Sequence, residues 1–164
     1  MNDNGQIGTV DYIALAEFRY LIRRFLRFSE EAARAAGIEP QQHQMLLAIK
    51  GLPPGTRASV GEIAERLQIQ HNSTVELMNR LESQGLVQRR RSSEDRREVL
   101  VSLTARGEKI LRELALHHRE QLRTAAPQLA AALQRAAGGR KASGRNSGPR
   151  RSTVAGRKTE TVRE

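Results

Sequence analysis

Cysteine and tryptophan are absent from this sequence of 164 residues, and its aromatic residues are only two tyrosines and three phenylalanines. Without cysteine there can be no disulfide bond, thiolate nucleophile, thiolate-ligated metal or thiol-based redox sensor. No uncharged stretch approaches the roughly twenty residues that a membrane helix needs. The first ten residues carry no lysine, no arginine and no apolar run, so nothing there is typical of a signal peptide. We therefore expect a cytoplasmic protein without a membrane partner.

Signatures of catalysis are absent from the sequence as well. It has no phosphate-binding loop, no nucleophile-elbow serine and no pair of carboxylates at catalytic spacing. Four histidines are present, but the adjacent His117 and His118 point to different sides of a helix, and neither has a second metal ligand four residues further on. The sequence therefore predicts no enzyme activity, no cofactor and no metal site.

Acidic residues are outnumbered by basic ones, 18 to 28, which gives a formal net charge of +10. A basic excess of this size favours nucleic acid as the partner. Residues 138–164 hold eight basic and two acidic side chains, are rich in glycine, serine and threonine, and offer two valines as their only larger apolar residues. Such a segment cannot bury enough apolar surface to offset its ordering entropy. We expect an N-terminal extension (1–10), one folded domain (11–137) and a basic, disordered tail (138–164).

Long helical periodicity dominates the first third of the chain. Apolar residues recur every three or four positions over residues 11–36, which predicts one amphipathic helix that Gly37 ends. Pro40 opens a second predicted helix that ends at Gly51, before a loop over residues 52–56.

A helix-turn-helix is predicted next. A short helix follows a capping box formed by Ser59 and Glu62. After a tight turn, Asn72 or Ser73 opens a second helix, which Gly85 closes. Two short helices joined by such a turn are typical of a DNA-binding motif.

A β-hairpin follows, because residues 86–91 and 98–103 have the composition of strands on either side of turn residues. Thr104 can cap a final long helix, and Pro127 is expected to open a last short helix that ends at Gly138. A hairpin appended to a helix-turn-helix is the layout of a winged helix. The predicted fold class is therefore mainly α with a small β-hairpin wing, flanked by long N- and C-terminal helices.

The segment from Asp95 to Thr104, followed by Gly107, resembles the wing signature of MarR-family transcriptional regulators. Upstream, Leu81-Glu82 and Gly85-Leu86-Val87 resemble the recognition-helix frame of the same family. The likeness spans about residues 11–137. It implies a homodimeric winged-helix repressor or activator whose first and last helices interlock as the dimer interface.

The second helix of the motif has one apolar and one polar face. Its predicted buried stripe consists of Thr74, Leu77, Met78 and Leu81. Because a recognition helix enters the major groove by its N-terminal end, the residues that we expect at base edges are His71, Asn72, Ser73 and Glu76. Glu76 has an alternative role, since it also completes a capping-box pattern with Ser73. Arg80, on the body of the helix, is expected to contact a phosphate.

The wing supplies the other expected DNA contacts. By the resemblance, Arg97 reaches into the minor groove, where a narrow A·T-rich sequence has an enhanced negative potential. Asp95 can pair with the Arg97 guanidinium and fix its direction; the alternative is that this pair only braces the turn. Further basic residues of the hairpin are expected to contact phosphates: Arg89, Arg90, Arg91 and Arg96.

A ligand pocket is a further expectation from the resemblance, because relatives in this family often bind small aromatic acids between the dimer helices and the DNA-binding lobe. Six residues of the first helix could line such a pocket: Tyr12, Phe18, Arg19, Tyr20, Arg23 and Phe25. Aromatic residues at helical spacing can equally form the core of a dimer interface, so both interpretations stay open. The absence of cysteine excludes the peroxide-sensing branch of the family.

The sequence thus predicts a nucleoid-associated regulator that binds a pseudo-palindromic operator in double-stranded DNA as a homodimer and represses transcription; release by a small aromatic effector and a purely structural role for the aromatic residues are both left open. The alternative is an architectural, weakly specific DNA-coating protein in which the arginine-rich tail supplies most of the binding. The two differ in specificity. A regulator prefers its operator over random DNA by about 10³ or more, and a coating protein does not.

Overall fold

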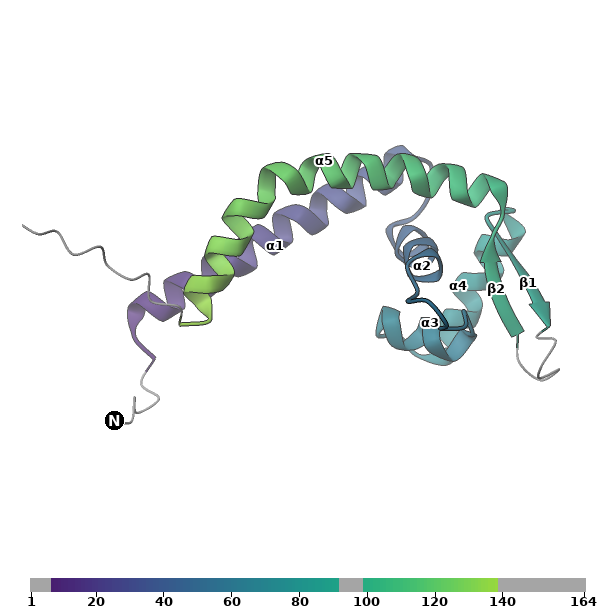
Figure 1. Ribbon diagram of the computed structural model, residues 1–164, viewed down its shortest axis with the longest axis horizontal. Helices are drawn as coiled ribbons and strands as arrows, with labels where there is room; N and C mark the ends of the chain where they lie inside the picture. The colour runs from purple at the N-terminus through teal and green to yellow at the C-terminus, as the bar shows by residue number, and fades with distance from the viewer. Residues whose placement is uncertain (1–6, 92–98, 139–164) are drawn as a thin grey trace, which may run out of the picture.

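The computed structural model describes residues 7–91 and 99–138. Two long helices, α1 (Thr9–Ala35) and α5 (Ala105–Ala136), lie side by side and form an arm that leads away from a smaller lobe (Figure 1). The lobe contains α2 (Pro40–Lys50), α3 (Val60–Leu67), α4 (His71–Ser83) and an antiparallel hairpin of β1 (Val87–Arg91) and β2 (Val99–Leu103). The predicted fold class, mainly helical with a β-hairpin and two long terminal helices, is confirmed.

Two helices end at glycines in the left-handed conformation. α1 ends before Gly37 (φ +78°), and the Ile38 amide then donates to the carbonyl oxygen of Ala33 (3.1 Å). Both Ala33 and Ile38 are buried, so this termination turns the chain back onto the core. α4 ends in the same way at Gly85 (φ +67°). Both helix ends agree with those predicted from the glycines.

The start of α4 corrects the prediction. The helix begins at His71 with Gln70 as its N-cap, and not at Asn72 or Ser73. The reason lies in the preceding turn, where Gln68 adopts a left-handed conformation (φ +54°) and closes α3 without a glycine. The turn is therefore complete by Gln70, and α4 starts earlier than its side-chain caps suggested.

The C-terminal helix is a second correction. Pro127 does not open a separate helix but lies inside α5, which continues to Ala136. The proline has no N–H to donate to the preceding turn, and α5 changes direction along its length (Figure 1), as helices with an internal proline do. Ala132 is fully buried beyond the proline, so tertiary packing sustains the helix past the lost hydrogen bond.

The predicted capping box at the start of α3 forms only in part. The Glu62 amide donates to Ser59 Oγ (3.3 Å), as expected. The Glu62 carboxylate, however, pairs with Arg66 one turn later (2.7 Å), and the Ser59 amide donates to the Arg57 carbonyl oxygen (2.8 Å). The amide of Ser59 is thus satisfied by the backbone of the loop.

The core of the lobe lies beneath α4. Its largest fully buried side chains include Met45, Leu46, Ile63, Met78, Leu81, Leu86 and Leu114. All four residues of the predicted α4 stripe are buried. Leu47 on α2 and Leu122 on α5 are exposed. The buried face of α4 is therefore fixed against the lobe, and its opposite face is turned outward.

Several large apolar side chains of the arm are exposed to solvent. The exposed members on α1 and α5 include Val10, Tyr12, Ile13, Leu15, Tyr20, Leu122 and Leu133. Despite this surface, no helix within residues 7–91 and 99–138 is both long enough and apolar enough to cross a membrane.

Candidate nucleic-acid interface

The polar face of α4 points away from the core. The five residues that the sequence assigned to DNA on this helix are all exposed: His71, Asn72, Ser73, Glu76 and Arg80. Because α4 begins at His71, Ser73 already lies inside its first turn, and the alternative capping box of Ser73 with Glu76 does not form. Glu76 instead lies 4.0 Å from Arg80, one turn further along. Glu76 is therefore on the outer face, where its carboxylate is open to a ligand.

The three arginines of β1 are divided between the two faces of the hairpin. Arg89 is paired with the buried Val101 of β2, and successive side chains of a strand point to opposite faces. Arg89 is half-buried, whereas Arg90, on the opposite face, and Arg91, at the strand end, are exposed. The structure thus separates residues that the sequence had grouped as one basic cluster.

Arg89 is held by α4. Its Nε lies 3.2 Å from Glu82 Oε2, and its Nη2 donates to the side-chain oxygen of Asn79. The same Glu82 carboxylate accepts the backbone N–H of Arg89 (3.3 Å). The sequence suggested a phosphate contact for Arg89, yet its guanidinium already has two protein partners. Spacing rules for helices or strands do not reveal this contact, because the residues lie on either side of a helix end.

Asp95, Arg96 and Arg97, which were predicted to complete the wing, lie outside the described residues. The strands that lead into and out of this segment pair as far as Arg91 and Val99. The roles of the three residues therefore stay predictions.

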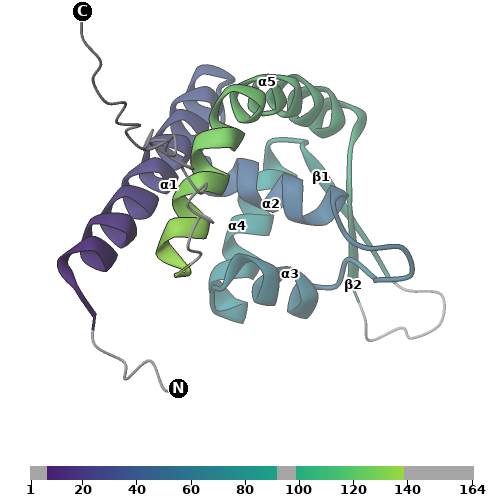
Figure 2. The ribbon, with the colours of Figure 1, turned by 60° about the vertical axis from the view of Figure 1, so that its left-hand side comes forward.

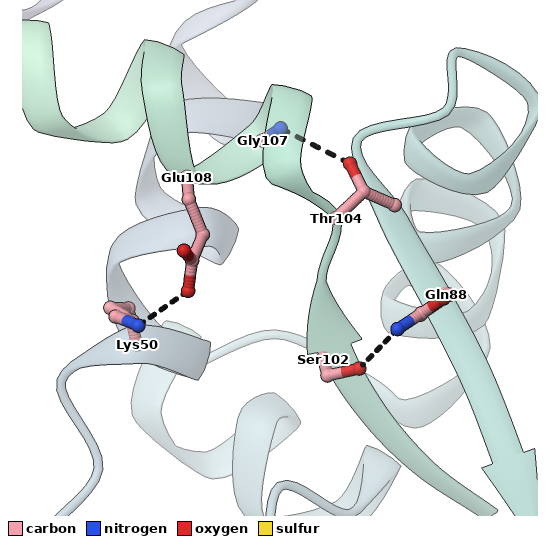
Figure 3. A network of polar contacts seen from close by, with 6 residues as sticks. All are labelled: Lys50, Gln88, Ser102, Thr104, Gly107 and Glu108. Atoms are coloured by element: carbon pink, nitrogen blue, oxygen red, sulfur yellow. Dashed lines mark hydrogen bonds and ion pairs between the residues drawn. The ribbon is translucent and has the colours of Figure 1, made fainter.

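The first turn of α5 fixes the junction between α4 and β1 (Figure 3). Thr104 Oγ1 accepts from the Gly107 amide (3.2 Å), which confirms the predicted cap, and donates to the Gly85 carbonyl oxygen (2.6 Å). The Thr104 amide donates to the Leu86 carbonyl oxygen (3.0 Å). A Cβ at Gly107 would lie 3.0 Å from the Leu86 carbonyl carbon and still closer to its oxygen. Only glycine permits this close approach of α5 to the junction.

An ion pair joins α2 to α5 on the same side of the lobe. Lys50 Nζ lies 2.5 Å from Glu108 Oε1 (Figure 3). The hydrogen bond from Lys50, together with its charge, lowers the pKa of the Glu108 carboxyl. Both side chains are exposed, so solvent screens the pair, and it aligns the two helices more than it stabilises the fold. The two residues are far apart in the sequence, which gave no signal for their contact.

The residues predicted for an effector pocket are not brought together within one chain. A hollow of about 360 Å³ lies between α1 and α5. Of the six predicted pocket residues, all of which the structure describes, only Phe25 lines this hollow. Tyr12 and Tyr20 are exposed, and the Tyr20 ring lies beneath the guanidinium of Arg24, 5.8 Å from its centroid. The pocket therefore stays a prediction, with Phe25 its best-placed member.

Two histidines meet where the lobe joins the arm. His43 on α2 is only 3% exposed, and its ring centroid lies 4.8 Å from that of His118 on α5. His118 Nδ1 is 2.6 Å from the Leu114 carbonyl oxygen, and its Nε2 is 2.8 Å from Ser29 Oγ on α1. Burial and the neighbouring His118 lower the pKa of His43 to about 4. Sequence spacing could not reveal this pair, because its members lie on different helices.

The histidine pair is not accompanied by further metal ligands. Within the described part of the chain, no group of three or more histidine, cysteine, aspartate or glutamate residues could hold a metal ion.

Comparison with known proteins finds similarity over the lobe. A model described as the MarR family matches residues 36–98. An HTH-type transcriptional regulator of Bacillus subtilis, YfiV, is 46% identical over 55 residues, and the organic hydroperoxide resistance transcriptional regulator of the same organism is 40% identical over 58 residues. These matches cover 34% and 35% of this chain, and 34% and 39% of the relatives. The chain thus spans little more than a third of the length of these curated relatives.

The fold has a counterpart among solved structures. A variant of MepR from S. aureus bound to an oligodeoxyribonucleotide matches with a TM-score of 0.55 and 21% identity, over 80% of this chain and 94% of that chain. At this level of identity the likeness shows a shared fold. The family match and the two regulators confirm the resemblance indicated by the residues of the wing and the recognition helix.

Proposed function

Because this chain carries the winged helix-turn-helix of the MarR family of transcriptional regulators, we propose that it binds a pseudo-palindromic DNA operator as a homodimer, at the nucleoid, and represses transcription. The observation that carries the proposal is the exposed polar face of α4 together with the exposed arginines of β1, the strand that follows it. A helix of this kind fits the major groove, and basic side chains next to it meet the phosphates. The MepR variant bound to an oligodeoxyribonucleotide has the same fold, which supports DNA as the partner.

The N-terminal part of α4 supplies the base contacts in this proposal. An asparagine at position 72 can bond to adenine through both its amide oxygen and its amide nitrogen. Glu76 can accept from the N4 amino group of cytosine, and His71 and Ser73 can meet either partner of a base pair. Arg80, Arg90 and Arg91 contact phosphates and set the register of the protein on the duplex.

We assign the dimer interface to the arm. Large apolar side chains of α1 and α5 are exposed there, and exposed apolar surface of this kind marks protein–protein interfaces. A two-fold axis would then place the two copies of α4 about 34–36 Å apart, one turn of DNA. A dimer is expected in sedimentation at micromolar concentration, and a stable monomer that still bound an operator tightly would contradict this assignment.

Selection of bound duplexes from a pool of random DNA tests the proposed function. We expect enrichment of an inverted repeat whose half-sites lie one helical turn apart. If no sequence is enriched, operator recognition is refuted. Release by a small aromatic effector belongs to the same proposal, so benzoate should dissociate the selected complex; a complex that persists rejects this part alone.

Arg97→Ala is expected to weaken binding to the selected operator by roughly 1–3 kcal/mol, mostly at sites with A·T-rich flanks, because the arginine would reach into a narrow minor groove. Asp95→Ala should follow with a smaller loss, since the aspartate orients the guanidinium. Titration of both variants against operators with A·T-rich and G·C-rich flanks measures the effect. If the Arg97 variant kept its affinity at moderate salt, the pair of Asp95 and Arg97 would serve only to stabilise the turn.

The basic segment 138–164 separates the proposal from its alternative, a weakly specific DNA-coating protein. Truncation after Ala137 removes eight basic and two acidic side chains, no aromatic residue and only two valines as larger apolar residues. We expect it to lower the affinity for operator and random DNA by similar factors, and to reduce the log–log salt slope by about 0.9 for each lost phosphate contact. A salt series with both DNAs measures this. Loss of all discrimination in the truncated protein would favour the coating function.

A further inference from the structure

We propose that Arg89 is a positioning residue that couples β1 to α4 and so sets the angle between the hairpin and the recognition helix. The discrimination between DNA sequences depends on this angle. The inference rests on the proposed DNA-binding function, but it concerns a residue that itself makes no base contact. Binding sites generally need their contacting groups held within roughly 0.5 Å and 10–20° of the productive geometry.

Three contacts join Arg89 to α4. The guanidinium meets the Glu82 carboxylate (3.2 Å) and the side-chain oxygen of Asn79, and the Arg89 backbone N–H donates to Glu82 (3.3 Å). The Glu82 carboxylate therefore contacts both the backbone and the side chain of Arg89. The Arg89 side chain is 26% exposed, so this contact is partly shielded from solvent and from salt.

The connection between α4 and β1 does not by itself fix the direction of the strand. It passes through Gly85 in a left-handed conformation, and glycine is the residue whose backbone has the fewest steric limits. Thr104 fixes the carbonyl groups of Gly85 and Leu86 from the side of α5. Beyond Leu86, the Arg89 side chain makes polar contacts with Asn79 and Glu82 of α4. Val87, also of β1, is buried in the core cluster that includes Leu77, Met78 and Leu81. The direction of β1 relative to α4 thus depends on Arg89 and Glu82.

The same contact orients Asn79 toward the hairpin. Its side-chain oxygen accepts from Arg89, so β1 sets the direction of the amide. Bidentate bonding to adenine requires both the oxygen and the nitrogen of an asparagine amide to face the base. We therefore assign Asn79 to the junction and base recognition to the N-terminal residues of α4.

Arg89→Gln tests the proposal against the matched control Arg90→Gln. Both variants lose one positive charge from adjacent positions of β1, but Arg90 lies on the outer face. Using the full chain, we measure affinities for the selected operator and for random DNA. Arg89→Gln is expected to reduce the operator-to-random ratio at least tenfold, whereas Arg90→Gln should weaken both affinities equally and leave the ratio within twofold.

Glu82→Gln separates positioning from direct phosphate contact, because the two predict opposite signs. If Arg89 only met phosphates, removal of a nearby carboxylate would strengthen binding to all DNA. If Arg89 positions β1 through Glu82, Glu82→Gln should bind the operator more weakly despite its more positive charge. Its operator-to-random ratio should then fall at least tenfold. Glu65→Gln, an exposed carboxylate of α3, is the control for charge alone.

Thermal unfolding followed by circular dichroism shows that each variant is folded at the titration temperature, and a merely structural role would then leave the ratio unchanged. An unchanged ratio in Arg89→Gln, or tighter operator binding by Glu82→Gln, overturns the proposal. If the random pool yields no enriched sequence, the proposed function fails instead. The two failures are therefore distinguishable.

Discussion

Gly107→Ala is expected to lower the free energy of unfolding by about 3 kcal/mol or more, because the added methyl group collides with the backbone of Leu86. Neither partner can move easily. Gly107 lies in the first turn of α5, which Thr104 caps, and the Leu86 carbonyl oxygen accepts the Thr104 amide. Relief would need a shift of α5 away from the junction of α4 and β1, and thus away from the core that Leu114 completes.

Chemical denaturation of Gly107→Ala and Gly61→Ala at equal protein concentration measures this effect. Gly61 is the matched control, because it lies in α3 and a Cβ there meets nothing within 4 Å. Its replacement by alanine should stabilise the protein by about 0.5–1 kcal/mol, since alanine favours the helix. Equal stabilities of the two variants would show that α5 does not approach Leu86 this closely.

Acidification is expected to remove about 3 kcal/mol of stability through His43 alone. Folding lowers the pKa of His43 to about 4, whereas in the unfolded chain it keeps its ordinary value of 6.5. Between these values the unfolded state binds more protons than the folded state. The stabilising effect of the neutral ring is therefore complete above pH 6.5, is lost progressively as the pH falls, and levels off below about pH 4.

The contribution of His43 is isolated by comparing the original chain with His43→Gln between pH 4 and 7.5. The difference in unfolding free energy between the two proteins should shrink as the pH falls, because glutamine does not titrate. A pH-independent difference for His43→Gln would mean that the buried ring takes up its proton as readily as a free one.

Local signals in the sequence sufficed for most helix ends and for the face of α4. Gly37 and Gly85 end helices because their left-handed conformation disfavours other residues, and this preference is visible without a structure. The buried stripe of α4 follows from its 3.6-residue period. The prediction that Pro127 opens a separate helix is wrong, because the rule that proline breaks a helix is local, whereas the packing that sustains α5 is not.

Contacts between distant segments could not be predicted in this way. His43 and His118 lie on α2 and α5, and Lys50 and Glu108 join the same two helices. Nothing in the spacing of these residues indicates that the fold brings them together. Arg89 shows a further limit. The run of arginines indicates positive charge, but only the register of β1 against β2 shows which of them faces inward.

The lobe and the arm have separate roles in the proposed function. In Figure 1 the start of α1 and the end of α5 lie apart from α4 and the hairpin, and Figure 2 shows α1 on the side of the molecule away from the hairpin. DNA contacts and dimer contacts are thus assigned to different parts of the molecule. Variants on α4 or β1 should alter binding to DNA without altering assembly.

The ratio of affinities for the selected operator and for random DNA, measured at one fixed salt concentration with the full chain, tests the central claim most directly. Recognition by the outer face of α4 predicts a ratio of about 10³ or more. The ratio should collapse in Asn72→Ala, which removes the residue best suited to adenine. A ratio near one for the original chain would contradict sequence-specific regulation and indicate a protein that binds DNA through its charge.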